Sequence, residues 1–161
     1  MTGAWARDLN TDIAAILRWN ASHLVSLLEP WEFSELRIED LPAVAKAMGL
    51  KWHGMPITDG EAPDRRLLLQ WPALSAALVR EMESGCRVVV HCKGGLGRAG
   101  TVAAMLLLQS GASRTAENAI NMIRRVRPGA IETAAQEKFL ARWEEELHRP
   151  VIGTDQPAAQ S

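Results

Sequence analysis

The sequence has no tyrosine and only two cysteines among its 161 residues. Cys86 and Cys92 fall on one predicted strand, which separates them by about 20 Å when it is extended. A disulfide requires Cα atoms within about 7 Å of each other, so these two thiols do not pair. No Cys/His cluster with metal-ligand spacing is present either, and we expect no metal and no cofactor. A disulfide framework and a zinc module are therefore excluded.

The sequence also lacks a long apolar run and an excess of charge. No stretch approaches the ~20 apolar residues that a membrane-spanning helix needs, and the N-terminus has no basic-then-apolar signal pattern. The formal net charge of −1 argues against general nucleic-acid binding, which requires a basic excess. Few cysteines in a signal-less chain suit a reducing compartment. We therefore expect a cytoplasmic protein with no membrane and no nucleic-acid partner.

Composition and periodicity predict one α/β domain over residues 1–149, followed by a flexible tail over residues 150–161 that lacks periodicity. The hydrophobic fraction of 47% fits a soluble globular domain. The predicted strands cover 22–28, 50–55 and the residues up to His91, and the predicted helices cover 10–19, 40–49, 72–82, 99–109, 113–125 and 133–148. We expect a turn at Glu29-Pro30, a loop over 56–64, and Pro72 in the first turn of its helix. This alternation predicts a three-layer α/β/α fold with a mainly parallel central sheet.

The segment His91-Cys92-Lys93-Gly94-Gly95-Leu96-Gly97-Arg98 is the most informative part of the chain. It follows an apolar run and precedes a helical pattern, so it reads as strand, loop and helix. Such a loop aims its backbone N–H groups at one point, and the helix N-terminus adds roughly half a positive charge. Arg98 can bind two phosphate oxygens with its planar guanidinium. The same field favours a thiolate at Cys92, which predicts a nucleophile above an oxyanion site.

This loop resembles the His-Cys-x5-Arg signature of cysteine-dependent protein phosphatases, in the dual-specificity branch. Two further blocks, 56–64 and 129–136, resemble the kinase-associated, cyclin-dependent-kinase-inhibitor type in the same order. The resemblance implies a protein-phosphatase-like domain in which Cys92 is the nucleophile and residues 93–98 bind phosphate. It implies no cofactor. Rhodanese and arsenate-reductase loops also hold an oxyanion under a cysteine, but they lack this spacing.

The resemblance also assigns supporting roles. It places the general acid at Asp59. Asp64 is the alternative, and Glu61 is a neighbour that could be mistaken for it. His91 is expected to hydrogen-bond the loop backbone and help hold the thiolate. Gln136 matches a glutamine that orients the attacking water, although Thr133-Ala-Ala-Gln136 is equally a helix capping box. In most of the family a Ser or Thr follows the loop arginine; here that residue is Ala99.

Basic residues and aromatic content bear on the substrate. Lys93 is expected at the mouth of the pocket, where it could favour polyanionic substrates, but Leu96 stands where phosphoinositide phosphatases carry a second basic residue. Arg124, Arg125 and Arg127 form either a solvated helix end or a docking site for a phosphopeptide. No tyrosine is available to wall a deep phosphotyrosine slot, which favours a shallow pocket.

We therefore expect a monomeric dual-specificity phosphatase that acts on phosphotyrosine and phosphoserine/threonine in proteins, a kinase among the candidate partners. Two alternatives stay open. The first is a phosphatase acting on phosphoinositides, nucleotides or RNA 5′ ends. The second is a phosphoprotein-binding module with weak catalysis, against which the intact Cys92 and Arg98 argue.

Overall fold

Three short parallel strands form the centre of the fold. The computed structural model describes residues 8–150. The strands are β1 (Ala21–Ser26), β2 (Lys51–Gly54) and β3 (Arg87–His91). Their order in the sheet is β2-β1-β3, and both pairings are parallel, with Leu24 beside Trp52 and Val89. The predicted parallel sheet is confirmed.

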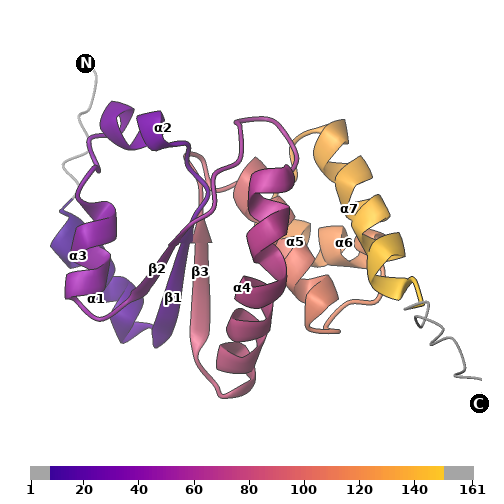
Figure 1. Cartoon of the computed structure of the whole chain (residues 1–161), viewed down its shortest axis with the longest axis horizontal. Coiled ribbons are helices and arrows are strands. Elements are labelled where there is room, and N and C mark those ends of the chain that lie inside the picture. The colour runs from indigo at the N-terminus through magenta and orange to yellow at the C-terminus, as the bar shows by residue number, and fades with distance from the viewer. Residues whose placement is uncertain (1–7, 151–161) are drawn as a thin grey trace, which may run out of the picture.

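Helices cover both faces of this sheet. They are α1 (Leu9–Arg18), α2 (Pro30–Glu35), α3 (Leu41–Ala47), α4 (Arg65–Glu83), α5 (Gly97–Gln109), α6 (Ala116–Val126) and α7 (Ala134–His148). Figure 1 shows α1 and α3 on one side of the sheet and α4 to α7 on the other. Successive side chains of a strand face opposite sides, so Leu24 packs with α1 and α3 while Val25 joins the larger core. The three-layer prediction is confirmed.

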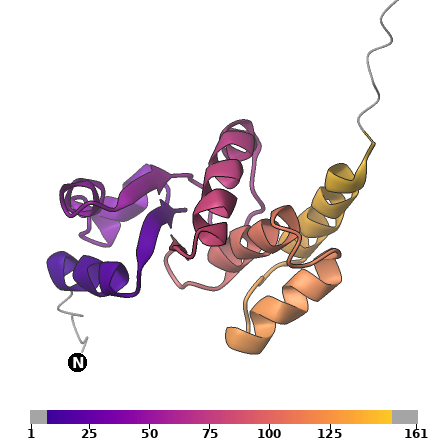
Figure 2. The same cartoon turned by 90° about the horizontal axis from the view of Figure 1, so that it is seen from below.

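The larger core explains how the second half of the chain is arranged. α5 contacts β3 on one side and both α6 and α7 on the other, and Figure 2 shows these two helices farther from the sheet than α4. Val102 and Met105 of α5 are fully buried in this core. The helix that follows the glycine-rich loop is therefore held rigidly between the sheet and its outer layer.

Local end signals agree with the predicted helix boundaries in this half. Thr115 and Thr133 cap α6 and α7 through their side chains, and the Thr133–Gln136 capping box is formed. Gly85, with a φ of 92°, follows the end of α4. The left-handed conformation is one that glycine adopts without steric cost. The predicted end of this helix near residue 82 is confirmed.

Two predictions of secondary structure are wrong. Pro30 begins α2 rather than a turn, because Glu29 and Glu32 form a reciprocal capping box around it. Pro72 lies inside α4, which already begins at Arg65 behind its cap Asp64. Proline removes one helical hydrogen bond, but burial of Leu67 and Trp71 stabilises the turns before it.

Two expectations concern the limits of the described chain. The tail predicted over residues 150–161 falls outside the described residues except for Pro150. Within residues 8–150, no helix is both long and apolar enough to cross a bilayer.

Candidate active site

The glycine-rich loop joins the carboxyl end of β3 to the start of α5. Cys92 directly follows β3, stays partly exposed, and Gly97 is the first residue of α5. Gly95 has a φ of 67°, a conformation that favours glycine. A Cβ on Gly97 would collide with the Glu132 carboxylate and approach the amide of Gln136 to 3.0 Å. The predicted strand, loop and helix are confirmed. Gly95 has a conformation that favours glycine, and a side chain at Gly97 would require Glu132 and Gln136 to move.

Arg98 lies under this loop and is held by a partner that the sequence did not indicate. Its side chain is 1% exposed, and Nη1 and Nη2 donate to the two carboxylate oxygens of Glu32 at 2.6 and 2.9 Å. Nη1 also donates to the Ile57 carbonyl at 3.0 Å. Arg98 Nε is buried and has no hydrogen-bond partner among residues 8–150. The guanidinium is therefore fixed on one side and keeps a free donor on another.

Glu32 is a buried carboxylate dedicated to this arginine. It is 1% exposed, and its Oε2 also accepts from the Glu29 N–H at 2.8 Å. Hydrogen bonds from Arg98 hold the pKa of Glu32 below its ordinary value, against the opposing effect of burial. Burial would lower the pKa of Arg98, but the hydrogen bonds and charge of Glu32 raise it. Both groups stay charged, since each compensates the other's desolvation.

Two aspartates were candidates for the general acid, and their surroundings differ. Asp59 is 68% exposed and its Oδ1 lies 3.4 Å from Arg98 Nη2, in the loop after β2. Asp64 caps α4, accepting the Arg66 N–H at 2.8 Å and its side-chain Nε at 3.0 Å. The Arg66 side chain holds the pKa of Asp64 below its ordinary value. Asp64 is thus engaged in capping α4 and pairing with Arg66, whereas Asp59 lies beside Arg98 in an exposed loop, and its role as general acid stays a prediction.

His91 connects the end of β3 to the loop. Trp52 Nε1 donates to Ser26 Oγ at 2.8 Å, and Ser26 Oγ lies 2.6 Å from His91 Nε2. His91 Nδ1 lies 3.4 Å from the Cys92 carbonyl oxygen. A ring protonated at Nδ1 satisfies both contacts, because Ser26 can then donate to Nε2. His91 thus contacts the loop backbone as the resemblance implied; Ser26 and Trp52 had no sequence signal.

Gln136 is held by hydrogen bonds at both ends of its side-chain amide. Its Oε1 accepts from the backbone N–H groups of Glu132 at 2.8 Å and Thr133 at 3.2 Å, which includes the capping box. Its Nε2 donates to the Glu61 carbonyl at 3.2 Å. The side chain is fully buried against Gly97. The capping prediction is confirmed, and the water-orienting role stays a prediction.

The basic residues near the loop differ in their partners. Lys93 Nζ lies 3.2 Å from Glu35 Oε1 on α2, so its charge is paired at the rim. Arg124 donates to the backbone carbonyls of Ala130 and Ile131. Of the cluster, only Arg127 contacts the loop itself. Arg124 and Arg127 therefore hold backbone carbonyls in place, a role that neither interpretation from the sequence included.

No hydroxyl follows the loop arginine, and the nearest candidate is occupied. Thr101 Oγ donates to the Gly97 carbonyl at 2.7 Å, within α5. Among residues 8–150, no group of three or more His, Cys, Asp or Glu side chains is placed to hold a metal ion. The chemistry available at this site is a thiol, a fixed guanidinium and a nearby carboxylate.

A partly exposed cysteine that opens a glycine-rich loop, with a buried arginine at the start of the following helix, is the arrangement of thiol-dependent phosphatases. Residues 7–140 match the protein family described as "Swiss Army Knife protein, DSP-PTPase phosphatase domain". The chain belongs to this family of dual-specificity and protein-tyrosine phosphatase domains.

The chain is also similar in sequence to curated proteins. Cyclin-dependent kinase inhibitor 3 of Rattus norvegicus is 34% identical over 117 residues, which cover 72% of this chain and 54% of the relative. Protein tyrosine phosphatase type IVA 2 of Mus musculus is 38% identical over 78 residues, 48% of this chain and 45% of the relative. The matches span about half the length of these relatives.

Solved structures give the same fold. Kinase-associated phosphatase with its catalytic cysteine replaced by serine has a TM-score of 0.78 and 27% identity, over 90% of this chain and 80% of that one. Tk-PTP in its active form has a TM-score of 0.68 and 29% identity, over 84% and 86%. The predicted family resemblance is confirmed.

Proposed function

We propose that this chain hydrolyses phosphate monoesters on proteins, at phosphotyrosine and phosphoserine/threonine, through a phosphocysteine at Cys92. The observation that carries the proposal is how the Arg98 guanidinium is held. Glu32 fixes its guanidinium under the loop, and its buried Nε keeps a donor without a partner among the described residues. A buried donor of this kind is satisfied by an anion bound in the loop.

In the first step the Cys92 thiolate attacks phosphorus in line with the ester oxygen. The S–P bond forms while the P–O bond to the substrate breaks, and Asp59 gives its proton to the leaving oxygen. The backbone amides of residues 93–98 and the Arg98 guanidinium hold the three equatorial oxygens. Such preorganised donors stabilise the charge that develops in the transition state.

In the second step a water molecule attacks the phosphorus of the phosphocysteine. Asp59, now a carboxylate, takes a proton from that water while the P–S bond breaks and Cys92 leaves as a thiolate. Inorganic phosphate is the product. Gln136, buried beside Gly97, is the candidate to orient the water.

Turnover of p-nitrophenyl phosphate tests the enzyme proposal against a binding module. Wild type is expected to turn over, and Cys92→Ser is expected to keep orthovanadate affinity but lose turnover, because a serine alkoxide is scarcely populated. Turnover of Cys92→Ser within tenfold of wild type contradicts the nucleophile assignment. Arg98→Lys is expected to be nearly as damaging, since a point charge cannot replace the planar two-donor contact.

A substrate panel separates protein substrates from the alternatives. Phosphotyrosine and phosphothreonine peptides are compared with soluble phosphoinositides, nucleotides and 5′-phosphorylated RNA. The proposal expects the peptides to have the highest kcat/KM, with Lys93 paired to Glu35 rather than free for a second anion. The relatives' names, kinase-associated phosphatase and cyclin-dependent kinase inhibitor, make a kinase the first protein substrate to test. We further propose that the protein acts as a cytoplasmic monomer.

A further inference from the structure

Three consecutive carbonyl groups of the glycine-rich loop are bound by one segment after α6. Arg127 Nη2 donates to the Gly94 carbonyl at 3.3 Å, and Arg127 Nε donates to the Gly95 carbonyl at 3.3 Å. The backbone N–H of Ile131 donates to the Leu96 carbonyl, also at 3.3 Å. Residues 127–131 therefore hold one side of the loop backbone.

Because the peptide group is planar, the contact between Arg127 and the loop carbonyls also determines the direction of the loop N–H groups. In a trans peptide the C=O and N–H of one unit point in opposite directions. When the carbonyls of Gly94 and Gly95 point at Arg127, the N–H groups of Gly95 and Leu96 point away from it. Those N–H groups belong to the amides that the proposed function assigns to the phosphate oxygens.

We infer that Arg127 is a positioning residue for the phosphate loop, an inference that rests on the proposed function. Its guanidinium has the fork shape needed to bind two neighbouring carbonyls at once. It acts on the substrate through the orientation of the loop amides, and the structure gives it no contact with Cys92 or Arg98. Gly95, in its left-handed conformation, sits at the centre of this contact.

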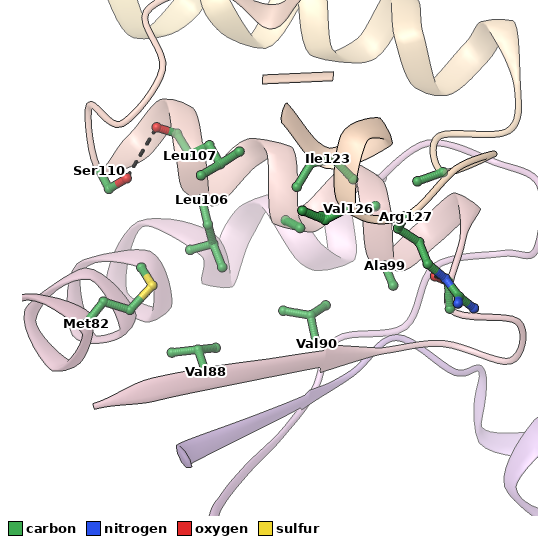
Figure 3. Close-up of a pocket in the computed structure, with 14 residues that line it drawn as sticks. Met82, Val88, Val90, Ala99, Leu106, Leu107, Ser110, Ile123, Val126 and Arg127 are labelled. Atoms are coloured by element: carbon green, nitrogen blue, oxygen red, sulfur yellow. Dashed lines mark hydrogen bonds between the residues drawn. The ribbon is translucent and has the colours of Figure 1, made fainter. Parts of the chain in front are cut away.

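Side-chain packing offers the loop little support at this point. A cavity of about 350 Å³ lies between β3, α5 and α6, and its lining near the loop includes Gly95, Ala99 and Gly100. Figure 3 shows Arg127 reaching from the end of α6 to the loop, with Ala99 and Val90 beside the cavity. Among the described residues that line it, Arg127 alone is charged. The guanidinium thus provides a connection between α6 and the loop that these small side chains cannot provide.

The chain offers a matched control two residues earlier. The side chain of Arg125 is exposed on α6 and makes no hydrogen bond or ion pair with residues 8–150. Arg125→Ala removes the same unit charge as Arg127→Ala from the same end of α6 without removing a contact to the loop. Arg127→Lys keeps the charge beside the loop, so a loss that it shares in part with Arg127→Ala reports the guanidinium contact and not the positive field.

Steady-state kinetics with p-nitrophenyl phosphate and calorimetric binding of orthovanadate test the inference. Arg127→Ala is expected to lower kcat about 10- to 100-fold with KM changed less than about threefold, because misplaced donors weaken the transition state more than the ground state. Vanadate affinity is expected to fall in parallel. Arg127→Lys, which can reach one carbonyl, is expected to fall between wild type and Arg127→Ala. Arg125→Ala is expected to stay within about twofold of wild type in both measurements.

Three results would overturn the inference. Equal losses in Arg125→Ala and Arg127→Ala would assign the effect to charge alone. A loss confined to KM, or much larger on a doubly phosphorylated peptide than on p-nitrophenyl phosphate, would make Arg127 a substrate contact. Unchanged kcat and vanadate affinity in Arg127→Lys, should Arg127→Ala fail to fold, would show that the fork is not needed. A wild type that binds vanadate without turnover contradicts the proposed function instead, and the vanadate comparison still tests Arg127.

Discussion

Ala99 occupies the position at which most of the family carries a hydroxyl, and its replacement by serine is the most informative single change. That hydroxyl stabilises the thiolate that leaves when the phosphocysteine is hydrolysed. Thr101 lies about 200° further around the helix at 3.6 residues per turn, and its hydroxyl already donates to the Gly97 carbonyl at 2.7 Å. The Thr133 hydroxyl likewise donates to the Gly60 carbonyl. Neither hydroxyl is free to act in place of the missing one.

The expected loss of rate follows from one missing hydrogen bond to the charge that develops on the leaving sulfur. Such a bond contributes about 1.5–3 kcal/mol, which corresponds to roughly 10- to 100-fold in rate. The loss falls on the second step alone, because the thiolate is the nucleophile in the first step and the leaving group only in the second. We therefore expect hydrolysis of the phosphocysteine to limit turnover in the wild-type chain.

Rapid-quench kinetics with p-nitrophenyl phosphate measures the two steps separately. Wild type is expected to release a burst of p-nitrophenol close to one equivalent per active site, followed by slow steady turnover. Ala99→Ser is expected to raise the steady rate roughly 10- to 100-fold, shrink the burst and leave the first step nearly unchanged. Ala99 borders the cavity beside α5, so a hydroxyl can be added there with little steric cost.

Ala99→Gly serves as the control, since it changes the same position without adding a hydroxyl. It is expected to retain the wild-type burst. The reasoning is refuted if wild type shows no burst and Ala99→Ser shows no gain. Another group would then supply the stabilisation, and a search would begin with the backbone amides of the loop.

Three further outcomes follow from the site. Asp59→Asn is expected to lower turnover of substrates with poor leaving groups about 10²- to 10³-fold and to flatten the alkaline limb of the pH–rate profile. Asp64→Asn should mainly lower the melting temperature. The opposite pattern would assign the general acid to Asp64. Glu32→Ala leaves Arg98 buried without its partner, which is expected to cost about 3 kcal/mol and to lower the melting temperature measured by calorimetry by roughly 6–12 °C. Glu32→Gln should cost less. A Glu32→Ala variant that melts at the wild-type temperature would contradict the structural role of the pair. Because Arg98 holds the pKa of Glu32 below its ordinary value of 4.5, the stability from this pair is present above about pH 4.5 and lost as the pH falls through the folded pKa; the melting temperature of Glu32→Gln should therefore fall less on acidification than that of wild type.

Local sequence signals were sufficient for the parts of the site that lie on one short segment. The Val88-Val89-Val90 run, the glycines and the apolar pattern after Arg98 predicted a strand, a loop and a helix, and each is present. These elements depend on neighbouring residues, so a periodic pattern with end signals identifies them. The alternation of helices and strands likewise predicted the parallel sheet.

The parts that escaped prediction depend on contacts between distant residues. Glu32 binds Arg98 across 66 positions, and nothing in Glu-Pro-Trp-Glu distinguishes a buried partner of an arginine from a solvated turn. The choice between Asp59 and Asp64 also required the structure, because it rests on the distance of each carboxylate from Arg98 and Arg66. Arg127 looked like one of three equivalent helix-end arginines. Only the position of the loop carbonyls separates it from the other two.

The Arg98–Glu32 contact links catalytic competence to the completeness of the fold. Glu32 belongs to α2, a helix of six residues between β1 and α3, while Arg98 belongs to α5 in the opposite half of the chain. An opening that detaches α2 alone would leave the nucleophile and its loop in place but release the guanidinium from its fixed orientation. Among residues 8–150, α2 is the shortest helix. The fraction of molecules in which it is docked therefore sets an upper limit on the fraction in which Arg98 is held in place.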